Sequence, residues 1–189
     1  TIAHNRYATT AKSPKIRNVQ PLLVDYKGGK LAVAHNGNLT NVAALRRAME
    51  ENGSIFQTTT DSEVVLHLIA RSAAPTLPDR VAEAVGQVQG ALTCLILSDD
   101  LILGYRDPSG VRPLSLGYLD GMYLLASETC AFDLLGAHWV RDVEPGEMVI
   151  LNGRGVESRR VATAGQKSQC MFELDYFSRP DSVVFGEAV

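Results

Sequence analysis

The sequence of 189 residues predicts an α+β fold in which helices pack on antiparallel sheet. Two observations support this prediction. Three segments with apolar residues at helical spacing lie within residues 41–89, and short apolar runs separated by tight turns follow within residues 91–151. Because the helices are grouped before the hairpins and do not alternate with strands, the pattern favours α+β over a parallel α/β sheet.

The first predicted elements are a strand and a helix. Residues 30–35 are short and apolar and follow two glycines, which is typical of a strand that leaves a tight turn. The helix that follows is expected to take Thr40 or Asn41 as its N-cap and to end at Gly53. The apolar positions within residues 42–49 give this helix one inward face.

Two more helices and a series of strands complete the predicted order. One helix begins near Asp61, where acidic and hydroxyl residues suit the positive end of a helix dipole. Another occupies residues 78–89, with a proline at its start and Gly90 as its stop. The remaining predicted elements are strands at residues 91–97, 101–105, 114–118, 122–126 and 147–151, and a short helix at residues 129–135.

Composition excludes several classes of function. A net charge of -3 with scattered Lys and Arg predicts no general affinity for nucleic acid or acidic membranes. The three cysteines are too few for a disulfide framework and indicate a cytoplasmic protein. No apolar run approaches the roughly 18 residues of a membrane span. Since the chain opens without Met in a patterned segment, we expect it to be a piece of a longer protein.

Four stretches place polar groups at the ends of predicted elements. They are H-N-R-Y-A-T-T from His4, H-N-G-N from His35, T-T-T-D-S-E from Thr58 and R-D-P-S-G-V-R-P from Arg106. From pattern alone, an Asn-Gly pair after a strand is more often a turn than a site. The functional alternative is an oxyanion hole, in which the glycine backbone and the asparagine amide supply two convergent donors.

Single residues in these stretches leave similar alternatives. Arg6 is either a surface charge or a fork that grips a carboxylate with two hydrogen bonds. Asp61 is by default an N-cap, or else a partner for a substrate ammonium. His35 is expected to be a hydrogen-bonded structural histidine. Residues 106–108 are expected to fix a turn, with the two charges paired locally.

Taken in order, these stretches resemble the class II (N-terminal-nucleophile) glutamine amidotransferases. The stretch C-M-F-E-L-D-Y-F-S-R-P-D-S from Cys170 resembles the amidophosphoribosyltransferases among them. The resemblance implies a four-layer αββα hydrolase domain of the N-terminal-nucleophile type, truncated at its N-terminus. It divides the chain into a glutaminase domain at residues 1–168 and a lead-in to a phosphoribosyltransferase domain at residues 169–189.

The resemblance also implies a reaction and roles for residues. In the family, an N-terminal cysteine hydrolyses glutamine, and the ammonia passes to 5-phosphoribosyl 1-pyrophosphate. The products are 5-phosphoribosylamine, pyrophosphate and glutamate, in the first committed step of purine biosynthesis. On this basis Arg6 holds the glutamine α-carboxylate, Asp61 takes the α-ammonium, Asn36 and Gly37 form the oxyanion hole, and Thr9 lines the pocket.

Cofactors and partners follow from the same resemblance. Mg²⁺ is expected in the phosphoribosyltransferase domain, and the full-length protein is expected to be a homo-oligomer. Cys170 is either one of four ligands to a [4Fe-4S] cluster or a buried structural thiol. Tyr7 serves either coupling to the acceptor site or packing.

One expectation and two alternatives concern the activity of this chain. Because the nucleophilic cysteine of the family lies upstream of the His4 stretch, we expect this chain alone to be inactive. One alternative is another class II amidotransferase with a different ammonia acceptor. The other is a non-catalytic glutamine-binding module built on the same fold.

Overall fold

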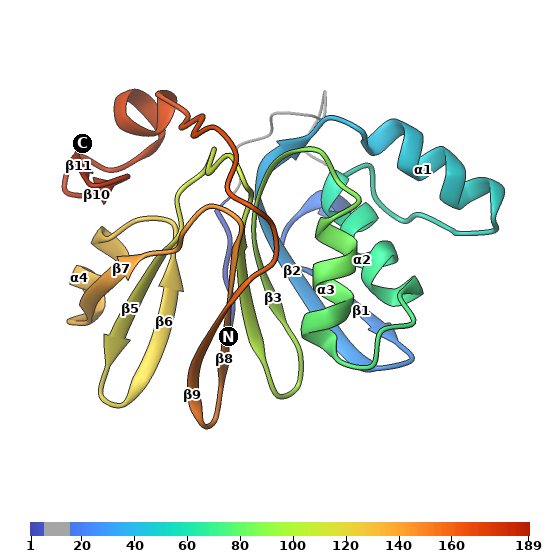
Figure 1. Cartoon of the computed structure of the whole chain (residues 1–189), viewed down its shortest axis with the longest axis horizontal. Helices are drawn as coiled ribbons and strands as arrows, with labels where there is room; N and C mark the ends of the chain where they lie inside the picture. Colours follow the sequence, from blue (N-terminus) through green and yellow to red (C-terminus); the bar gives the residue numbers. More distant parts are fainter. Residues whose placement is uncertain (6–15) are drawn as a thin grey trace.

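The centre of the molecule is a six-stranded antiparallel sheet, seen in a computed structural model that describes residues 1–5 and 16–189 (Figure 1). The strands lie in the order β1-β2-β3-β4-β8-β9. Their bounds are Leu22–Tyr26 for β1, Gly29–Leu39 for β2, Gly90–Leu97 for β3, Ile102–Arg106 for β4, Glu147–Asn152 for β8 and Gly155–Arg160 for β9.

Helices cover one face of this sheet. They are α1 (Val42–Glu51), α2 (Asp61–Arg71) and α3 (Leu77–Val85), and Figure 1 shows α2 and α3 stacked against β2 and β3. The buried side chains between them include Val65, Ile69 and Val81 from the helices and Val33, Ile96 and Leu103 from the strands. Burial of this apolar surface is the main stabilising contribution on this side of the molecule.

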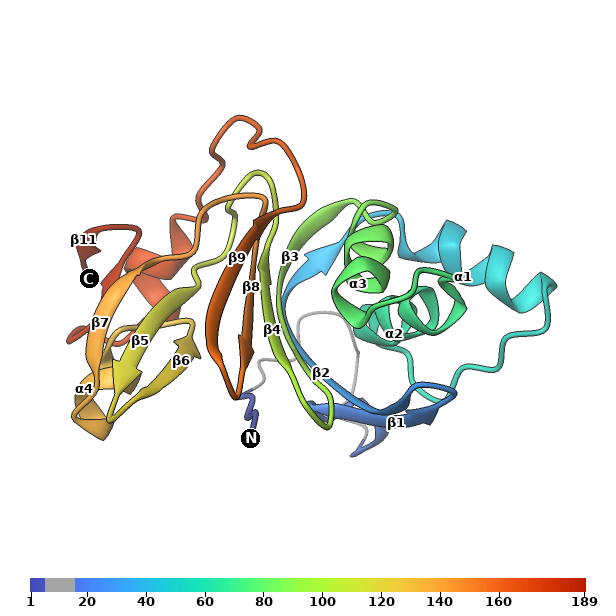
Figure 2. The ribbon, with the colours of Figure 1, turned by 60° about the horizontal axis from the view of Figure 1, so that its bottom comes forward.

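A second, three-stranded sheet lies against the other face, as the turned view in Figure 2 shows. It has the order β6-β5-β7, with β5 at Ser115–Leu119, β6 at Met122–Ala126 and β7 at His138–Asp142. A smaller core fills the space between the sheets, formed by Leu114, Leu116, Val143, Val149 and Leu151.

The fourth layer is the short helix α4 (Cys130–Leu135), which packs on the outer face of β5. A Cβ added to Gly117 would lie 2.7 Å from Cδ1 of Phe132, so the phenyl ring of Phe132 in α4 contacts the β5 backbone directly. The layers therefore run helix, sheet, sheet, helix. The prediction of an α+β fold with the αββα arrangement is confirmed.

Several predicted elements differ from the observed ones in extent. The strand predicted at residues 30–35 continues through the Asn-Gly pair to Leu39, so the turn alternative at that pair is wrong. Asn41 is the N-cap of α1, and α2 begins at Asp61 as predicted. The helix predicted over residues 78–89 spans Leu77–Val85. Strands β1, β7 and β9 were not predicted from the sequence.

The C-terminal residues fold back onto the loop at residues 106–113 and onto α4. Cys170 N donates a backbone hydrogen bond of 3.0 Å to Val111 O in this loop. A short π-helix, Glu173–Phe177, comes next in the chain. A small hairpin of β10 (Val183–Val184) and β11 (Glu187–Ala188) ends the chain. Within the described residues, none of the helices has the length and apolar character needed to cross a membrane.

Candidate active site

The far end of β2 holds the Asn-Gly pair. Asn36 lies opposite Thr93 and Gly37 lies opposite Leu92 in the β2–β3 ladder. Gly37 has a φ of 147°, and a Cβ placed there would lie 2.2 Å from the carbonyl oxygen of Ala91. Only glycine fits this position, because any larger side chain would collide with the backbone of β3.

The backbone of this segment faces an open edge of the sheet. β1 pairs with β2 only as far as Val33, and none of the strands within residues 16–189 pairs with the next residues on that side. The N–H groups of His35 and Leu39 point to this edge, where they donate to Gln20 Oε1 at 2.6 Å and to Asp61 Oδ2 at 3.1 Å. N–H groups alternate along a strand, so the Gly37 N–H is directed to the same edge.

Asp61 lies beside that edge as the first residue of α2. Its carboxylate accepts hydrogen bonds from Leu39 N at 3.1 Å and Ser62 N at 3.0 Å, and its Oδ1 lies 3.5 Å from His35 Nδ1. The expectation that Asp61 is an N-cap is wrong, since Thr60 occupies the cap. The side chain is 15% exposed. A carboxylate offers about four lone-pair positions, so these contacts leave capacity for a ligand.

The charge on Asp61 is stabilised by its surroundings. Burial alone would raise the pKa of this carboxyl. The hydrogen bond and charge of His35, together with the backbone N–H groups of Leu39 and Ser62, outweigh burial and hold the pKa below its ordinary value. The residue is therefore ionised at neutral pH and suited to bind a cation.

The loop that leads into α2 is held from within by Glu63. This buried carboxylate accepts hydrogen bonds from Gln57 N, Thr58 N and Thr58 Oγ1, each at 2.7 Å. On the other side of the loop, Asn18 bonds to both the backbone and the side chain of Thr59. The T-T-T-D-S-E stretch is thus a fixed platform that presents Asp61.

His35 is buried and hydrogen-bonded, as the sequence led us to expect. Its Nε2 lies 3.1 Å from the carbonyl oxygen of Ala91, and its Nδ1 lies 3.4 Å from Ser62 Oγ. Gln20, which holds the backbone of His35, was missed by the sequence analysis. A glutamine in an irregular segment before a proline carries no signal that separates it from an ordinary loop residue.

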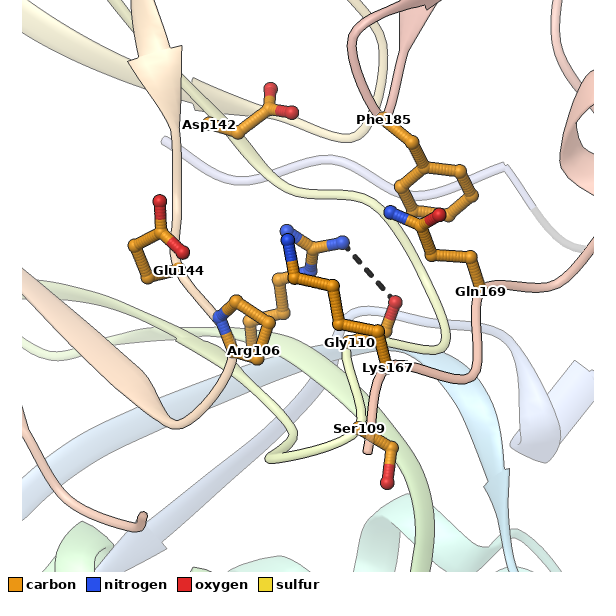
Figure 3. Close-up of a pocket in the computed structure, with 9 residues that line it drawn as sticks. Arg106, Ser109, Gly110, Asp142, Glu144, Lys167, Gln169 and Phe185 are labelled. Carbon is orange, nitrogen blue, oxygen red and sulfur yellow. Dashed lines mark hydrogen bonds between the residues drawn. The ribbon is translucent and has the colours of Figure 1, made fainter. Parts of the chain in front are cut away.

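The loop at residues 106–113 is stabilised in a way that the sequence did not predict. The expected local pairing of Arg106 with Asp107 is wrong. The Arg106 guanidinium donates to three backbone carbonyls, and Figure 3 shows its bond of 3.1 Å to Gly110 O. Asp107 Oδ1 instead accepts from the backbone N–H of Ser109 at 3.0 Å, which closes the turn.

The pocket in Figure 3 is separate from the Asn-Gly edge. It lies between this loop and the C-terminal segment, and its lining includes Arg106, Asp142, Glu144 and Lys167. Neither the residues of β2 nor Asp61 contribute to it. Opposite charges line its wall in equal number, so it carries no preference for one sign of ligand.

Not all of the predicted site falls within the described residues. Arg6, Tyr7 and Thr9 lie outside them. Of the predicted residues that are described, Asn36 and Gly37 are neighbours in β2, and Asp61 contacts the same strand two residues further on, through Leu39 N.

The three cysteines are free thiols. Cys94 is in β3 opposite His35, where burial raises the pKa of its thiol to about 12, so it cannot act as a nucleophile at neutral pH. Cys130 is buried at the start of α4, and Cys170 Sγ lies 3.7 Å from Arg112 Nη1. The part of the chain that the structure describes contains no group of three or more metal-ligating side chains.

Comparison with known proteins agrees with this arrangement. The model of the glutamine amidotransferase domain family matches residues 4–133. The amidophosphoribosyltransferase of Bacillus subtilis (strain 168) is 47% identical over 98% of this chain and 39% of its own length. That of Rhizobium etli is 44% identical over 100% of this chain and 39% of its own length.

A solved structure is similar over nearly the whole chain. The glutamine phosphoribosylpyrophosphate (PRPP) amidotransferase from B. subtilis, complexed with ADP and GMP, superposes with a TM-score of 0.91 at 47% identity. The match covers 97% of this chain and 39% of that one, so the present chain spans about two fifths of such proteins. On the match of residues 4–133, together with this likeness, the chain belongs to the glutamine amidotransferase domain family.

Proposed function

We propose that this chain is the glutamine-binding part of an amidophosphoribosyltransferase. The observation that supports the proposal best is the placement of Asp61 against the open edge of β2 that carries Gly37. An anionic group and a directed N–H donor at one edge suit a ligand with an ammonium at one end and a reacting amide at the other.

In this proposal Asp61 binds the α-ammonium of glutamine, and Arg6 binds the α-carboxylate with Thr9 beside it. A cysteine thiolate, the nucleophile that the family resemblance implies, adds to the side-chain amide carbon. Negative charge then develops on the amide oxygen. The Gly37 N–H and the Asn36 side-chain amide donate to that oxygen, and such donors matter because they are fixed before the charge forms.

The acceptor reaction belongs to the remainder of the protein. We propose that residues 169–189 lead from the glutaminase domain at residues 1–168 into a phosphoribosyltransferase domain that uses Mg²⁺. Ammonia released from glutamine would replace pyrophosphate on 5-phosphoribosyl 1-pyrophosphate and give 5-phosphoribosylamine. The proposal includes a homo-oligomer in the cytoplasm, a location that agrees with the three free cysteines.

Binding of an iron-sulfur cluster is a separate part of the proposal, and it concerns Cys170. A [4Fe-4S] cluster needs four thiolates, and among the described residues no group of metal-ligating side chains surrounds Cys170, whose Sγ lies 3.7 Å from Arg112 Nη1. Cys170 therefore supplies at most one ligand. Iron analysis of the full-length protein, purified without oxygen, tests whether it does.

The test of the proposed function is the Asn36→Ala variant of the full-length protein. Glutamine hydrolysis is expected to fall by roughly 10²–10³, the effect typical of losing one oxyanion donor. Formation of 5-phosphoribosylamine from free ammonia is expected to persist, since that route bypasses the glutamine site. The matched control is Asn38→Ala, an exposed amide in the same strand.

Two results would count against the proposal. Equal activity in the Asn36 and Asn38 variants would remove the oxyanion role. Glutamine hydrolysis without any product from 5-phosphoribosyl 1-pyrophosphate would point instead to a class II amidotransferase with another acceptor.

A further inference from the structure

We infer that His35 is a positioning residue that joins the oxyanion strand to the ammonium-binding carboxylate. The inference rests on the proposed function and goes beyond it, because His35 would touch neither glutamine nor the nucleophile. Its side chain is 1% exposed, and each of its ring nitrogens faces a different half of the site.

The Nε2 side of the ring holds β3 next to Gly37. Nε2 lies 3.1 Å from the carbonyl oxygen of Ala91. A carbonyl only accepts hydrogen bonds, so Nε2 carries the proton. The same carbonyl oxygen is the atom that a Cβ on Gly37 would meet at 2.2 Å. His35 therefore fixes the backbone group that defines the space around the oxyanion donor.

The Nδ1 side of the ring holds the first turn of α2. Nδ1 lies 3.4 Å from Ser62 Oγ and 3.5 Å from Asp61 Oδ1. Both side chains that open α2, the Ser62 hydroxyl and the Asp61 carboxylate, thus face the same ring nitrogen. The ring thereby sets where α2 begins, and with it the position of the Asp61 carboxylate.

The backbone of His35 is held as tightly as its ring. His35 N donates to Gln20 Oε1 at 2.6 Å, and Gln20 Nε2 donates to His35 O at 3.4 Å. With both the main chain and the ring fixed, a displacement at one end of the imidazole is passed to the other. Glutamine binding and oxyanion stabilisation are thus joined through one side chain.

Two substitutions of His35 in the full-length protein separate its Nε2 contact from its Nδ1 contacts. The amide of His35→Gln reaches the place of Nε2 and keeps the contact with Ala91, whereas that of His35→Asn reaches the place of Nδ1 and keeps the contact with Ser62. We expect His35→Gln to raise the KM for glutamine about fivefold to tenfold with kcat nearly unchanged, the effect of one lost hydrogen bond. We expect His35→Asn to lower kcat by a similar factor with KM nearly unchanged.

A third, milder variant tests the same contact if the His35 variants do not fold. Ser62→Ala removes only the hydroxyl that contacts Nδ1 and is expected to raise KM in the same way as His35→Gln. His138→Gln, on exposed β7, is the control and is expected to match the parent in both constants. The Tm of every variant is measured alongside, so that a kinetic change can be separated from lost stability.

The outcomes decide between the inference and the function on which it rests. If the parent protein is active and every His35 variant shows the same change in KM and kcat, in step with its loss of Tm, the positioning role alone is overturned. Variants indistinguishable from the parent overturn it as well. A parent that does not hydrolyse glutamine overturns both the proposed function and the inference.

Discussion

At the scale of single residues, Gly37 is a position where the neighbouring backbone leaves no room for a side chain. A methyl group there would lie 2.2 Å from Ala91 O and 2.8 Å from His35 Nε2, at a φ of 147°. Gly37→Ala is therefore expected to push β2 away from β3 and to misdirect the N–H donor. We expect a loss of roughly 10²–10³ in glutamine hydrolysis by the full-length protein, measured at saturating glutamine.

The matched control is Gly153→Ala, where a Cβ would meet nothing within 4 Å. That variant is expected to keep full activity. If Gly37→Ala also kept it, the Gly37 N–H would not be the oxyanion donor.

Asp61 gives the second prediction at this scale. Asp61→Asn keeps the shape of the side chain but removes the charge that its neighbours stabilise. A charge-assisted hydrogen bond contributes about 1.5–3 kcal/mol, so the KM for glutamine is expected to rise about tenfold to a hundredfold. Asp79→Asn, in the first turn of α3, is the control and is expected to leave KM unchanged. An unchanged KM in Asp61→Asn would assign the ammonium to another group.

The sequence could indicate these residue types but not all of their partners. Asn36, Gly37 and Asp61 stand out because polar groups end predicted elements, and the family resemblance gave each of them a role. Gln20 did not stand out, because its effect depends on a contact with His35 across 15 positions of chain. The roles of Arg6 and Thr9 stay predictions.

At the scale of elements, the loop before α2 depends on one buried carboxylate. Glu63 accepts three hydrogen bonds from Gln57 and Thr58. Glu63→Gln replaces one acceptor oxygen by an NH₂ group, which cannot accept a hydrogen bond from these donors. The free energy of unfolding is expected to fall by about 1–3 kcal/mol, measured by denaturant titration. Glu50→Gln, half-exposed on α1, should change it by less than about 0.5 kcal/mol. Equal effects would mean that Glu63 does not fix the loop.

Burial explains which elements could be predicted from sequence. Strands β3, β4 and β8 have apolar cores on both faces, which gives the continuous apolar runs that identify buried strands. Strand β9, with the sequence G-V-E-S-R-R, is an exposed edge whose polar residues have no apolar alternation. Strand β7 is also largely exposed. Strand β1 turns Leu22, Val24 and Tyr26 toward the core, but it is only five residues long.

At the scale of the whole molecule, the six-stranded sheet is shared by two cores. Met148 and Ile150 of β8 pack toward the helices, whereas Val149 and Leu151 pack toward the second sheet. Side chains that alternate along one strand therefore contribute to both cores and link the layers. We expect Leu103→Ala, on the helix side, and Leu116→Ala, in the second sheet, each to lower the free energy of unfolding by about 2–5 kcal/mol.

Both variants are expected to unfold in a single transition that near-ultraviolet and far-ultraviolet circular dichroism report at the same temperature. Two separate transitions in Leu116→Ala would show that the second sheet unfolds independently. In that case the shared sheet would not make the layers one cooperative unit.

An ion pair also joins the two sheets, and it makes their association depend on pH. Glu147 of β8 is buried and accepts hydrogen bonds from Arg141 of β7 at 2.6 and 2.9 Å, from Glu144 N and from Ser158 of β9. Burial acts to raise the pKa of Glu147. The bonds from Arg141, Ser158 and the Glu144 backbone outweigh it and hold the pKa below the ordinary 4.5.

A carboxyl with a lowered pKa in the folded state stabilises the fold above its ordinary pKa, and this contribution is lost as the pH falls through the folded value. Glu147→Gln is therefore expected to lower the free energy of unfolding by about 1–3 kcal/mol at neutral pH. The difference from the parent should stay constant down to about pH 5 and shrink below it. Glu157→Gln, on exposed β9, should change stability by less than about 0.5 kcal/mol throughout. A difference that grew on acidification would mean that the uncharged carboxyl, and not the ion pair, holds the sheets together.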